Sequence, residues 1–471
     1  MGTRLHSPMS GETAQTRLIR FFELLREDRA FLLLCVLLCV LWVAGGASRE
    51  DALGQAVVRS AAWAVLIGAA LFGRRPTFDR LMPVLALLSV AALLPILQLI
   101  PLPPALWQAL PGRDAFVSAA EGVDQPWRPW SLVPGATWNA AASLVVPAAV
   151  LLLIAQMRKE GRANLPELLF GLVIASLVLA LVQVSAGGSR NPFINQTTGQ
   201  IGGPFANRNH FALFMALGCL IVPVWTFRAT KAPSWRIPAA VGLLPLLLLS
   251  ILASGSRAGL LLGGAGLVLG LALVRDEIRR ALRRYPRWAF PAVLAGILLL
   301  VAACVLLAVA TDRAVSIQRI LAEDSAQDMR RQALPVVIDM IGAYFPFGFG
   351  LGGFDPLFRV HEPLALLKLT YFNHAHNDFL EIAGGAGVPG ILALVVALGW
   401  WAWASFNAWR PSEARSATAR LGSAMLLLIF IASLFDYPAR TPIIMAVITI
   451  AGIWLTEAGR GRRGAALPMS G

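Results

Sequence analysis

The chain has 471 residues, of which 57% are hydrophobic and only 14% are charged. So apolar a composition excludes an ordinary soluble domain and is typical of a polytopic membrane protein. The formal net charge of +14 does not indicate a nucleic-acid-binding protein, because the arginines lie between apolar runs, as basic loops on the cytoplasmic side of a membrane do.

Hydropathy predicts about twelve membrane-spanning helices, and the expected fold class is therefore all-α. In chain order the predicted spans are 30–47, 55–72, 81–100, 138–156, 168–184, 210–227, 238–253, 259–274, 290–310, 378–403, 421–435 and 442–455. All four cysteines lie inside apolar runs, without a His or Asp at ligand spacing. They indicate neither a disulfide nor a metal site.

The basic residues orient these helices. If the N-terminus is cytoplasmic and successive helices alternate in direction, 26 of the 40 Lys and Arg residues lie on the cytoplasmic side, with the densest patch at 275–287. The positive-inside rule then predicts that both termini are cytoplasmic. The expected organisation is a cytoplasmic segment at 1–29, a transmembrane helical domain at 30–457 and a cytoplasmic tail at 458–471.

Three long loops fall on the outer face in this topology. They cover 101–137, which is rich in Pro and Trp, 187–209, which is rich in Gly and Asn, and 311–376. The third has an amphipathic stretch followed by the glycine-rich run FPFGFGLGGF at 345–354. We expect one or two helices lying against the membrane and then a turn. Long ordered loops are usually functional.

Three short polar motifs precede or join predicted helices on this outer face. They are GGPFANRNH at 202–210, SGSRAG at 254–259 and HAHND at 374–378. Polar groups at a membrane boundary are costly to desolvate, so their clustering indicates a functional site. Because all three fall on the same face, we expect them to converge.

The arginines of the motifs suit an anionic headgroup such as a pyrophosphate, because a guanidinium forms two parallel hydrogen bonds to phosphate oxygens. The candidates are Arg208 and Arg257, with Arg331 of the long loop as a further member. The alternative is that each arginine only extends its charged end toward the membrane interface. That alternative is weaker for Arg257, because its Ser-Gly-Ser turn exposes backbone N–H groups. The neighbouring polar candidates for substrate binding are Asn207, Asn209 and Ser256.

The third motif offers candidates for proton transfer. His374 and His376 precede a long apolar helix, and their plainest role is capping or interfacial hydrogen bonding. Asp378 is expected to cap that helix and Glu381 to cap or orient, whereas a metal site with the two histidines is less favoured. Asn377 joins His374 as a candidate for substrate binding.

Other polar and aromatic residues of the outer face have plainer explanations. Between the last two helices, Asp436 and Arg440 are expected to form an ion pair. Three tryptophans of the first long loop are candidates for stacking on sugar rings, with an interfacial aromatic belt as the alternative. They are Trp107, Trp127 and Trp130.

At these motifs the sequence resembles the O-antigen ligase and surface polysaccharide polymerase superfamily of bacterial inner membranes. The Asn-Arg-Asn-His run, the SGSRAG hairpin, the glycine-rich turn and their order all look like that superfamily. The most specific element is His376-Asn377 followed after nine residues by Gly387. Gly390 stands where the ligase pattern has Thr, which keeps the polymerase alternative open. The related region is expected at about 200–400, with 311–376 as a periplasmic loop.

This resemblance implies a fold like that of the type C membrane glycosyltransferases. It also implies an inverting glycosyltransferase that needs no metal, nucleotide or other cofactor. The implied donor is a polyprenyl-diphosphate-linked saccharide at the periplasmic surface, and the acceptor is lipid A–core in ligases or another lipid-linked glycan in polymerases. Arg208 and Arg257 match the diphosphate-binding arginines, and His376 matches the proposed base. Further expected partners are membrane lipids and a chain-length regulator, but no nucleic acid.

Two other classes of function compete with this interpretation. A lipid-linked-oligosaccharide flippase or other transporter requires polar residues near the bilayer midplane and broken helices, and the predicted spans contain few charges. A structural assembly subunit does not need the His-Asn cluster.

Overall fold

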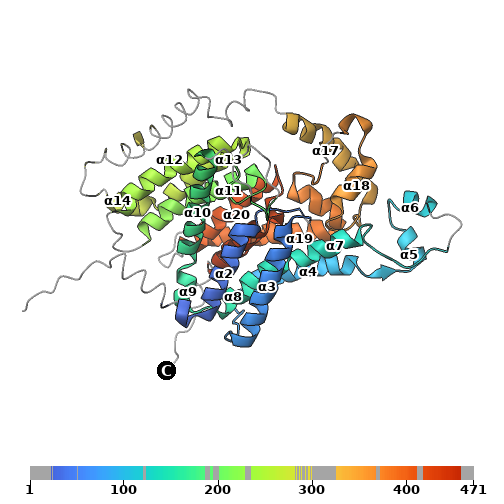
Figure 1. Ribbon diagram of the computed structural model, residues 1–471, viewed down its shortest axis with the longest axis horizontal. Coiled ribbons are helices and arrows are strands. Elements are labelled where there is room, and N and C mark those ends of the chain that lie inside the picture. The colour runs from blue at the N-terminus through green and yellow to red at the C-terminus, as the bar shows by residue number, and fades with distance from the viewer. Residues whose placement is uncertain are drawn as a thin grey trace, which may run out of the picture.

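The computed structural model describes residues 23–457 except 24, 50, 120–123, 186–190, 195–200, 229–234, 368–371, 411–416 and most of 282–324. The described part is a bundle of α-helices, and a pair of two-residue strands adds a small hairpin at one end (Figure 1). The strands β1 (Pro101–Leu102) and β2 (Arg128–Pro129) pair in antiparallel fashion. The predicted all-α class is confirmed.

Helices occupy eleven of the twelve predicted spans, and the ninth, 290–310, falls almost entirely outside the described residues. The helices are α2 (Arg29–Ala44), α3 (Leu53–Phe72), α4 (Met82–Gln98), α5 (Pro104–Gln108), α6 (Asp114–Ser118), α7 (Pro134–Ser143), α8 (Val145–Gln156), α9 (Lys159–Ala163), α10 (Leu165–Ser185), α11 (Arg208–Phe227), α12 (Arg236–Ser254), α13 (Arg257–Leu273), α14 (Arg275–Ala281), α17 (Ser325–Tyr344), α18 (Phe354–His361), α19 (Asp378–Trp409), α20 (Ala417–Ser433) and α21 (Pro442–Thr456), with 3-10 turns η1 (Leu364–Leu366) and η2 (Pro438–Arg440).

Six helices of the described part are long and apolar enough to cross a membrane, counting α7 and α8 together as one. A seventh is obtained if α13 and α14, bent by 59°, form one span. Four shorter apolar helices, α2, α4, α20 and α21, pack beside them. The predicted polytopic membrane architecture is confirmed, whereas the number twelve stays a prediction.

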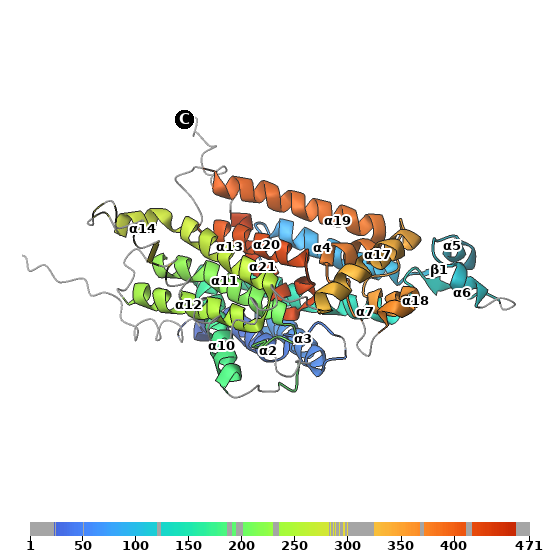
Figure 2. The ribbon, with the colours of Figure 1, turned by 90° about the horizontal axis from the view of Figure 1, so that it is seen from above.

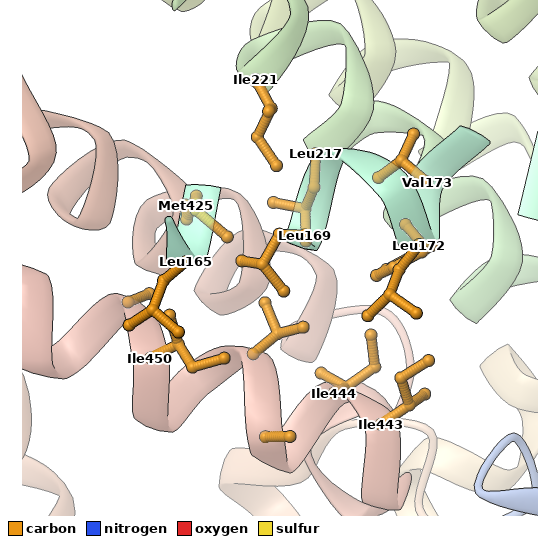
Figure 3. Packing of buried hydrophobic residues seen from close by; sticks show 14 of the residues in the cluster. Leu165, Leu169, Leu172, Val173, Leu217, Ile221, Met425, Ile443, Ile444 and Ile450 are labelled. Atoms are coloured by element: carbon orange, nitrogen blue, oxygen red, sulfur yellow. The ribbon is translucent and has the colours of Figure 1, made fainter. Parts of the chain in front are cut away.

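Helix α11 is the centre of the bundle. In its apolar 18-residue stretch, 89% is buried inside the protein. Leu217 of α11 lies beside Leu169 of α10, and in this view the leucines of α10 lie between α11 and the isoleucines of α21 (Figure 3). On another side, α13 approaches α11 closely, since a Cβ at Gly266 would lie 2.5 Å from the Ala216 carbonyl oxygen. Small residues allow this contact between membrane helices, because association there depends on close packing. This contact fixes the first residues of α11 and α13 next to each other.

The described part of the long loop that precedes α19 has its own hydrophobic core. The amphipathic face of α17 buries Ala333, Val337 and Met340 against aromatic residues of α18 and of the glycine-rich turn. Both helices lie beside the first turns of α19, at the end of the bundle opposite α14 (Figure 2). In the described part of the loop one helix, α17, precedes the glycine-rich turn, within the one or two predicted, and α18 follows the turn. Their position relative to the membrane stays a prediction.

Gly387 attaches this loop to α19. It has φ +57°, outside the helical region, and α19 bends there. A Cβ at this position would lie 2.0 Å from the Pro346 carbonyl oxygen, which accepts a hydrogen bond from the Val388 N–H at 2.8 Å. The next contacts are also between backbones, as Phe349 N–H and Gly350 N–H donate to the carbonyls of residues 384 and 385. These contacts explain on steric grounds why the predicted motif has glycine at position 387.

Replacing Gly387 with alanine should detach the glycine-rich turn from α19. The positive φ and the clash with Pro346 together should cost about 2–4 kcal/mol of folding stability. A lower melting temperature in detergent should report this loss. The matched control is Gly399→Ala on the same helix, where a Cβ meets nothing within 4 Å. Equal melting temperatures for the two variants would show that the turn is not held at Gly387.

The loop between α4 and α7 corrects one prediction about tryptophans. Trp107 is 3% exposed, and its ring nitrogen donates to the Pro129 carbonyl at 2.9 Å. Arg113 and Arg128 lie over the same ring at 5.5 and 5.0 Å from its centroid. Trp107 is therefore a core residue of the loop and cannot stack on a sugar. Trp127 is 65% exposed and Trp130 packs edge-to-face on Phe347, so sugar stacking stays a prediction for these two.

Candidate functional site

The three predicted motifs meet at one cavity, which we call the first cavity. It has a volume of about 450 Å³. Its walls include residues at the N-terminal ends of three helices, α11, α13 and α19. The remaining walls come from α17 and from the turn after α20. The predicted convergence of the motifs is therefore observed in the structure.

Side-chain caps begin all three helices. The Asn207 side chain accepts from Asn209 N–H, Ser256 accepts from Gly259 N–H, and Asn377 accepts from two N–H groups of α19. These polar residues fulfil the preference for Asn and Ser at helix starts. Asp378, predicted as the cap of α19, is instead its first helical residue. That prediction was wrong because the neighbouring Asn377 has the extended backbone that a cap requires.

Four guanidinium groups line the first cavity. Arg208 and Arg257 are the first residues of α11 and α13, and Arg330 and Arg331 come from α17. Asp436 is the carboxylate among the lining residues. The partial positive charge of helix N-termini adds to the guanidinium charges. Such a site favours an anion with several oxygens, and phosphate groups are its usual ligands.

His376 and Asp436 form a hydrogen-bonded pair at this cavity. The distance between His376 Nδ1 and Asp436 Oδ1 is 3.1 Å. An ionised carboxylate only accepts, so Nδ1 carries the proton and Nε2 keeps a lone pair. His376 has φ 49°, in the left-handed region, which non-glycine residues adopt mainly at functional sites or turns. The pair therefore holds an imidazole with one nitrogen ready to accept a proton.

Burial and charge set the ionisation of this pair. Burial lowers the pKa of His376 below its ordinary value of 6.5, although Asp436 acts in the opposite direction. For Asp436, burial alone would raise the pKa, but the His376 hydrogen bond and the charge of Arg330 hold it well below 3.8. At neutral pH the imidazole is thus neutral and the carboxylate ionised.

Asp436 also organises the first motif. Its Oδ2 accepts from Asn207 Nδ2 at 3.1 Å and from Asn209 Nδ2 at 2.5 Å, and Arg330 lies 3.8 Å away. Its Oδ1 lies 3.9 Å from His210 Nε2. The sequence analysis assigned Asn207 and Asn209 to substrate binding. In the structure both amides hold the carboxylate that orients His376.

A second histidine–carboxylate pair is formed by His374 and Glu381. His374 Nδ1 is 3.0 Å from Glu381 Oε1, and Glu381 also accepts from Ala375 N–H. Arg440 Nη2 lies 3.1 Å from the same Glu381 oxygen, and Arg440 Nε lies 3.7 Å from Asp378. Glu381 is therefore an orienting carboxylate, one of the two roles expected for it.

The prediction of an ion pair between Asp436 and Arg440 is wrong. Residues 438–440 form a 3-10 turn, and the two side chains join different histidine pairs. Tyr437 lies between these pairs, with ring centroids 4.1 Å from His374 and 5.0 Å from His376. Burial and the charge of Asp436 raise the pKa of Tyr437, so its hydroxyl stays protonated.

The remaining predicted site residues are distributed as follows. Arg331 and Asn377 line the first cavity, and Asn377 also donates to the Leu434 carbonyl at 3.1 Å. Ser256 is buried and acts as a cap. His374 faces a second cavity. Sequence reasoning did not assign Arg330 or His210 to the site, although His210 ends the first motif and Arg330 precedes Arg331. It also missed the contacts of Asp436 with the histidines.

The described residues contain no group of three or more His, Cys, Asp or Glu side chains that could hold a metal ion. His374 and His376 instead point their Nδ1 atoms at different carboxylates.

Residues 242–395 match the family model described as O-Antigen ligase. The matched segment includes the Arg257 motif, the described part of the long loop and the His376 motif, whereas the Arg208 motif precedes it. The predicted resemblance to the O-antigen ligase superfamily is confirmed over this segment, and the chain is a multi-pass membrane protein. A search of curated proteins finds no match to the chain.

Proposed function

We propose that this protein is a membrane glycosyltransferase that transfers or polymerises a polyprenyl-diphosphate-linked glycan. The observation that carries the proposal is the first cavity, where four guanidinium groups and three helix N-termini surround the His376–Asp436 pair. The guanidinium groups suit a diphosphate, and the neutral imidazole suits a hydroxyl nucleophile. The match to the O-Antigen ligase family model supports the same chemistry.

The proposed reaction is a displacement at the anomeric carbon of the donor sugar. An acceptor hydroxyl oxygen forms the new bond to that carbon as the bond to the diphosphate oxygen breaks. His376 Nε2 takes the proton from the hydroxyl, which contributes about 10²–10⁴-fold. Arg208 and Arg257 stabilise the negative charge that develops on the leaving polyprenyl diphosphate. A single displacement of this kind inverts the anomeric configuration and uses no metal.

The proposed orientation places this cavity on the periplasmic face of the bacterial inner membrane, with both termini in the cytoplasm. Support comes from a separate cavity of about 980 Å³, at the opposite ends of α3, α8, α11 and α21. Seven Lys and Arg side chains line it. The positive-inside rule assigns such a surface to the cytoplasm.

The test of the function is a transfer assay with purified protein and a polyprenyl-diphosphate glycan. We expect release of polyprenyl diphosphate together with a glycan bonded to an acceptor, and the two products should form in equal amounts. Lipid A–core and a second lipid-linked glycan are the acceptors that separate a ligase from a polymerase. Movement of intact donor across vesicles, without bond cleavage, would instead identify a flippase and overturn the proposal.

The ionisation of His376 gives a pH prediction. Because burial lowers its pKa below 6.5, the neutral base should persist at mildly acidic pH. Single-turnover transfer should therefore keep more than half of its full rate at pH 6.5 and decline further as the pH falls through the lowered pKa. Asp436→Asn should move this acidic limb to still lower pH, since the carboxylate favours the protonated ring. A limb centred at or above pH 6.5 would contradict a buried, neutral His376.

A further inference from the structure

Three successive residues at the start of α19 bind the turn that joins α20 to α21. His376 pairs with Asp436, and Asn377 Nδ2 donates to the Leu434 carbonyl at 3.1 Å. The third residue is Asp378, which is 4% exposed and is not among the residues that line the first cavity. Asp378 is therefore placed to act through other residues rather than on a substrate in that cavity.

The Asp378 carboxylate holds both ends of this turn. Its Oδ2 accepts from the hydroxyl of Ser433, the last residue of α20, at 2.9 Å. The same oxygen accepts from the N–H of Ala439, in the 3-10 turn η2, at 3.2 Å. Asp436 lies between these two residues in the chain. One carboxylate thus closes the segment that carries the hydrogen-bond partner of His376.

His376 is not free to follow a shift of Asp436. Its φ of 49° lies in the left-handed region, which a non-glycine residue keeps only where its surroundings hold it. The next residue, Asn377, is extended and caps α19 with its side chain. The 3.1 Å distance between His376 Nδ1 and Asp436 Oδ1 therefore depends on where the turn lies.

The contacts of Asp378 are largely buried, which makes their loss consequential. Ser433 and Asp436 are each 4% exposed, and Arg440 Nε lies 3.7 Å from Asp378 Oδ1. Without the carboxylate, the Ser433 hydroxyl and the Ala439 N–H would lose their acceptor in a largely buried place, which is unfavourable. The turn would then shift to find other partners, and Asp436 would shift with it.

We propose that Asp378 is a positioning residue for the transfer reaction, which keeps Asp436 within hydrogen-bond distance of His376 by holding both ends of the turn. This inference rests on the proposed function and adds to it a residue that acts on the imidazole only through another carboxylate. The run from 376 to 378 then has three separate tasks, namely proton acceptor, helix cap and anchor of the turn.

The first test is the single-turnover rate of transfer at saturating donor, which does not depend on how much of the protein is folded. Asp378→Ala should lower this rate about 10–100-fold, because a misplacement of about 1 Å can cost about 10²-fold. The Kd of the donor should stay unchanged. Asp378→Asn keeps an oxygen that can accept from Ser433 and Ala439, so it should lose less. Equal losses in both variants would overturn the inference.

The second test is a double-variant cycle. Because Asp378 is proposed to act through Asp436, the loss in Asp378→Ala/Asp436→Asn should be smaller than the product of the two single losses. Losses that multiply would show independent roles and overturn the inference. Ser433→Ala removes one donor but keeps the buried carboxylate, and it takes the place of Asp378→Ala in the same cycle if that variant does not fold.

Asp28→Ala is the matched control for a buried carboxylate. Asp28 is 3% exposed and accepts from the N–H groups of Phe31 and Arg158 at 3.2 and 2.8 Å. It precedes the 16 residues of α2, a rise of about 24 Å, whereas Gly46 at the other end accepts from the N–H of Ala206 in the first motif. Its loss should lower the melting temperature but leave the single-turnover rate unchanged. A slowed rate in this variant would overturn the inference, and absence of transfer by the unmodified protein would instead overturn the proposed function.

Discussion

Replacing His376 with alanine should slow glycan transfer by about 10²–10⁴-fold while leaving donor binding intact. The ring is held by Asp436 at 3.1 Å, and burial keeps it neutral, so its loss removes the proton acceptor rather than a charge. Three helix N-termini at the cavity also disfavour a protonated ring. Single-turnover transfer with saturating donor measures the step, and a donor-binding titration shows that the site is still formed.

Two companion variants separate the roles of the histidine pairs. His374→Ala should reduce the turnover less, because His374 borders a second cavity and does not line the first. Asp436→Asn should give an intermediate loss of turnover. The amide can either donate to Nδ1 or accept from it, so it binds both tautomers of the ring and no longer fixes the proton on Nδ1. Equal, mild defects at His374 and His376 would reduce His376 to a positioning residue. A large loss confined to His374 would assign the base to the other pair.

Much of the helical framework could be predicted from the sequence, because the hydrocarbon core of a membrane constrains each spanning segment by itself. A segment that crosses the membrane must satisfy its backbone within itself, so each span appears as an apolar run. Helix α11 was predicted at 210–227 and begins at Arg208. The difference arises because Asn207, and not the end of the apolar run, caps the helix.

The meeting of the three motifs could also be predicted, because alternating spans assign each motif to a face. Residues 202–210, 254–259 and 374–378 lie far apart in the chain but precede or join helices that start on the same side. Counting spans is sufficient for that conclusion. It gives no distances, and so the cavity itself and its other walls were not predicted.

The partners inside the site could not be predicted from local spacing. Asp436 lies 60 residues from His376 and 229 from Asn207, and its nearest opposite charge in sequence is Arg440. Spacing therefore favoured a pair that the 3-10 turn at 438–440 prevents. Trp107 was misassigned for the same reason, since its burial depends on Pro129 across the loop. Burial and long-range pairing come from tertiary packing.

Arg257→Lys should impair transfer almost as much as Arg257→Ala, for which we expect a loss of about 10²–10³-fold in turnover. Arg257 is the first residue of α13, and close packing of α13 on α11 fixes its position relative to Arg208. Lysine keeps the charge but lacks the planar fork that binds two phosphate oxygens at once. Turnover of purified protein with the polyprenyl-diphosphate glycan measures both variants.

The control for this comparison is Arg280→Lys on α14, an exposed arginine paired with Glu277 at 2.9 Å and far from the cavity along the same bent helix pair. It should leave turnover unchanged, and equal melting temperatures should show that all the variants fold. Near-normal turnover of Arg257→Lys would mean that charge alone is sufficient, and Arg257 would then only reach the membrane interface. A strong loss of turnover in Arg257→Lys, with slower release of polyprenyl diphosphate in both Arg257 variants, would place the guanidinium on the diphosphate as it leaves.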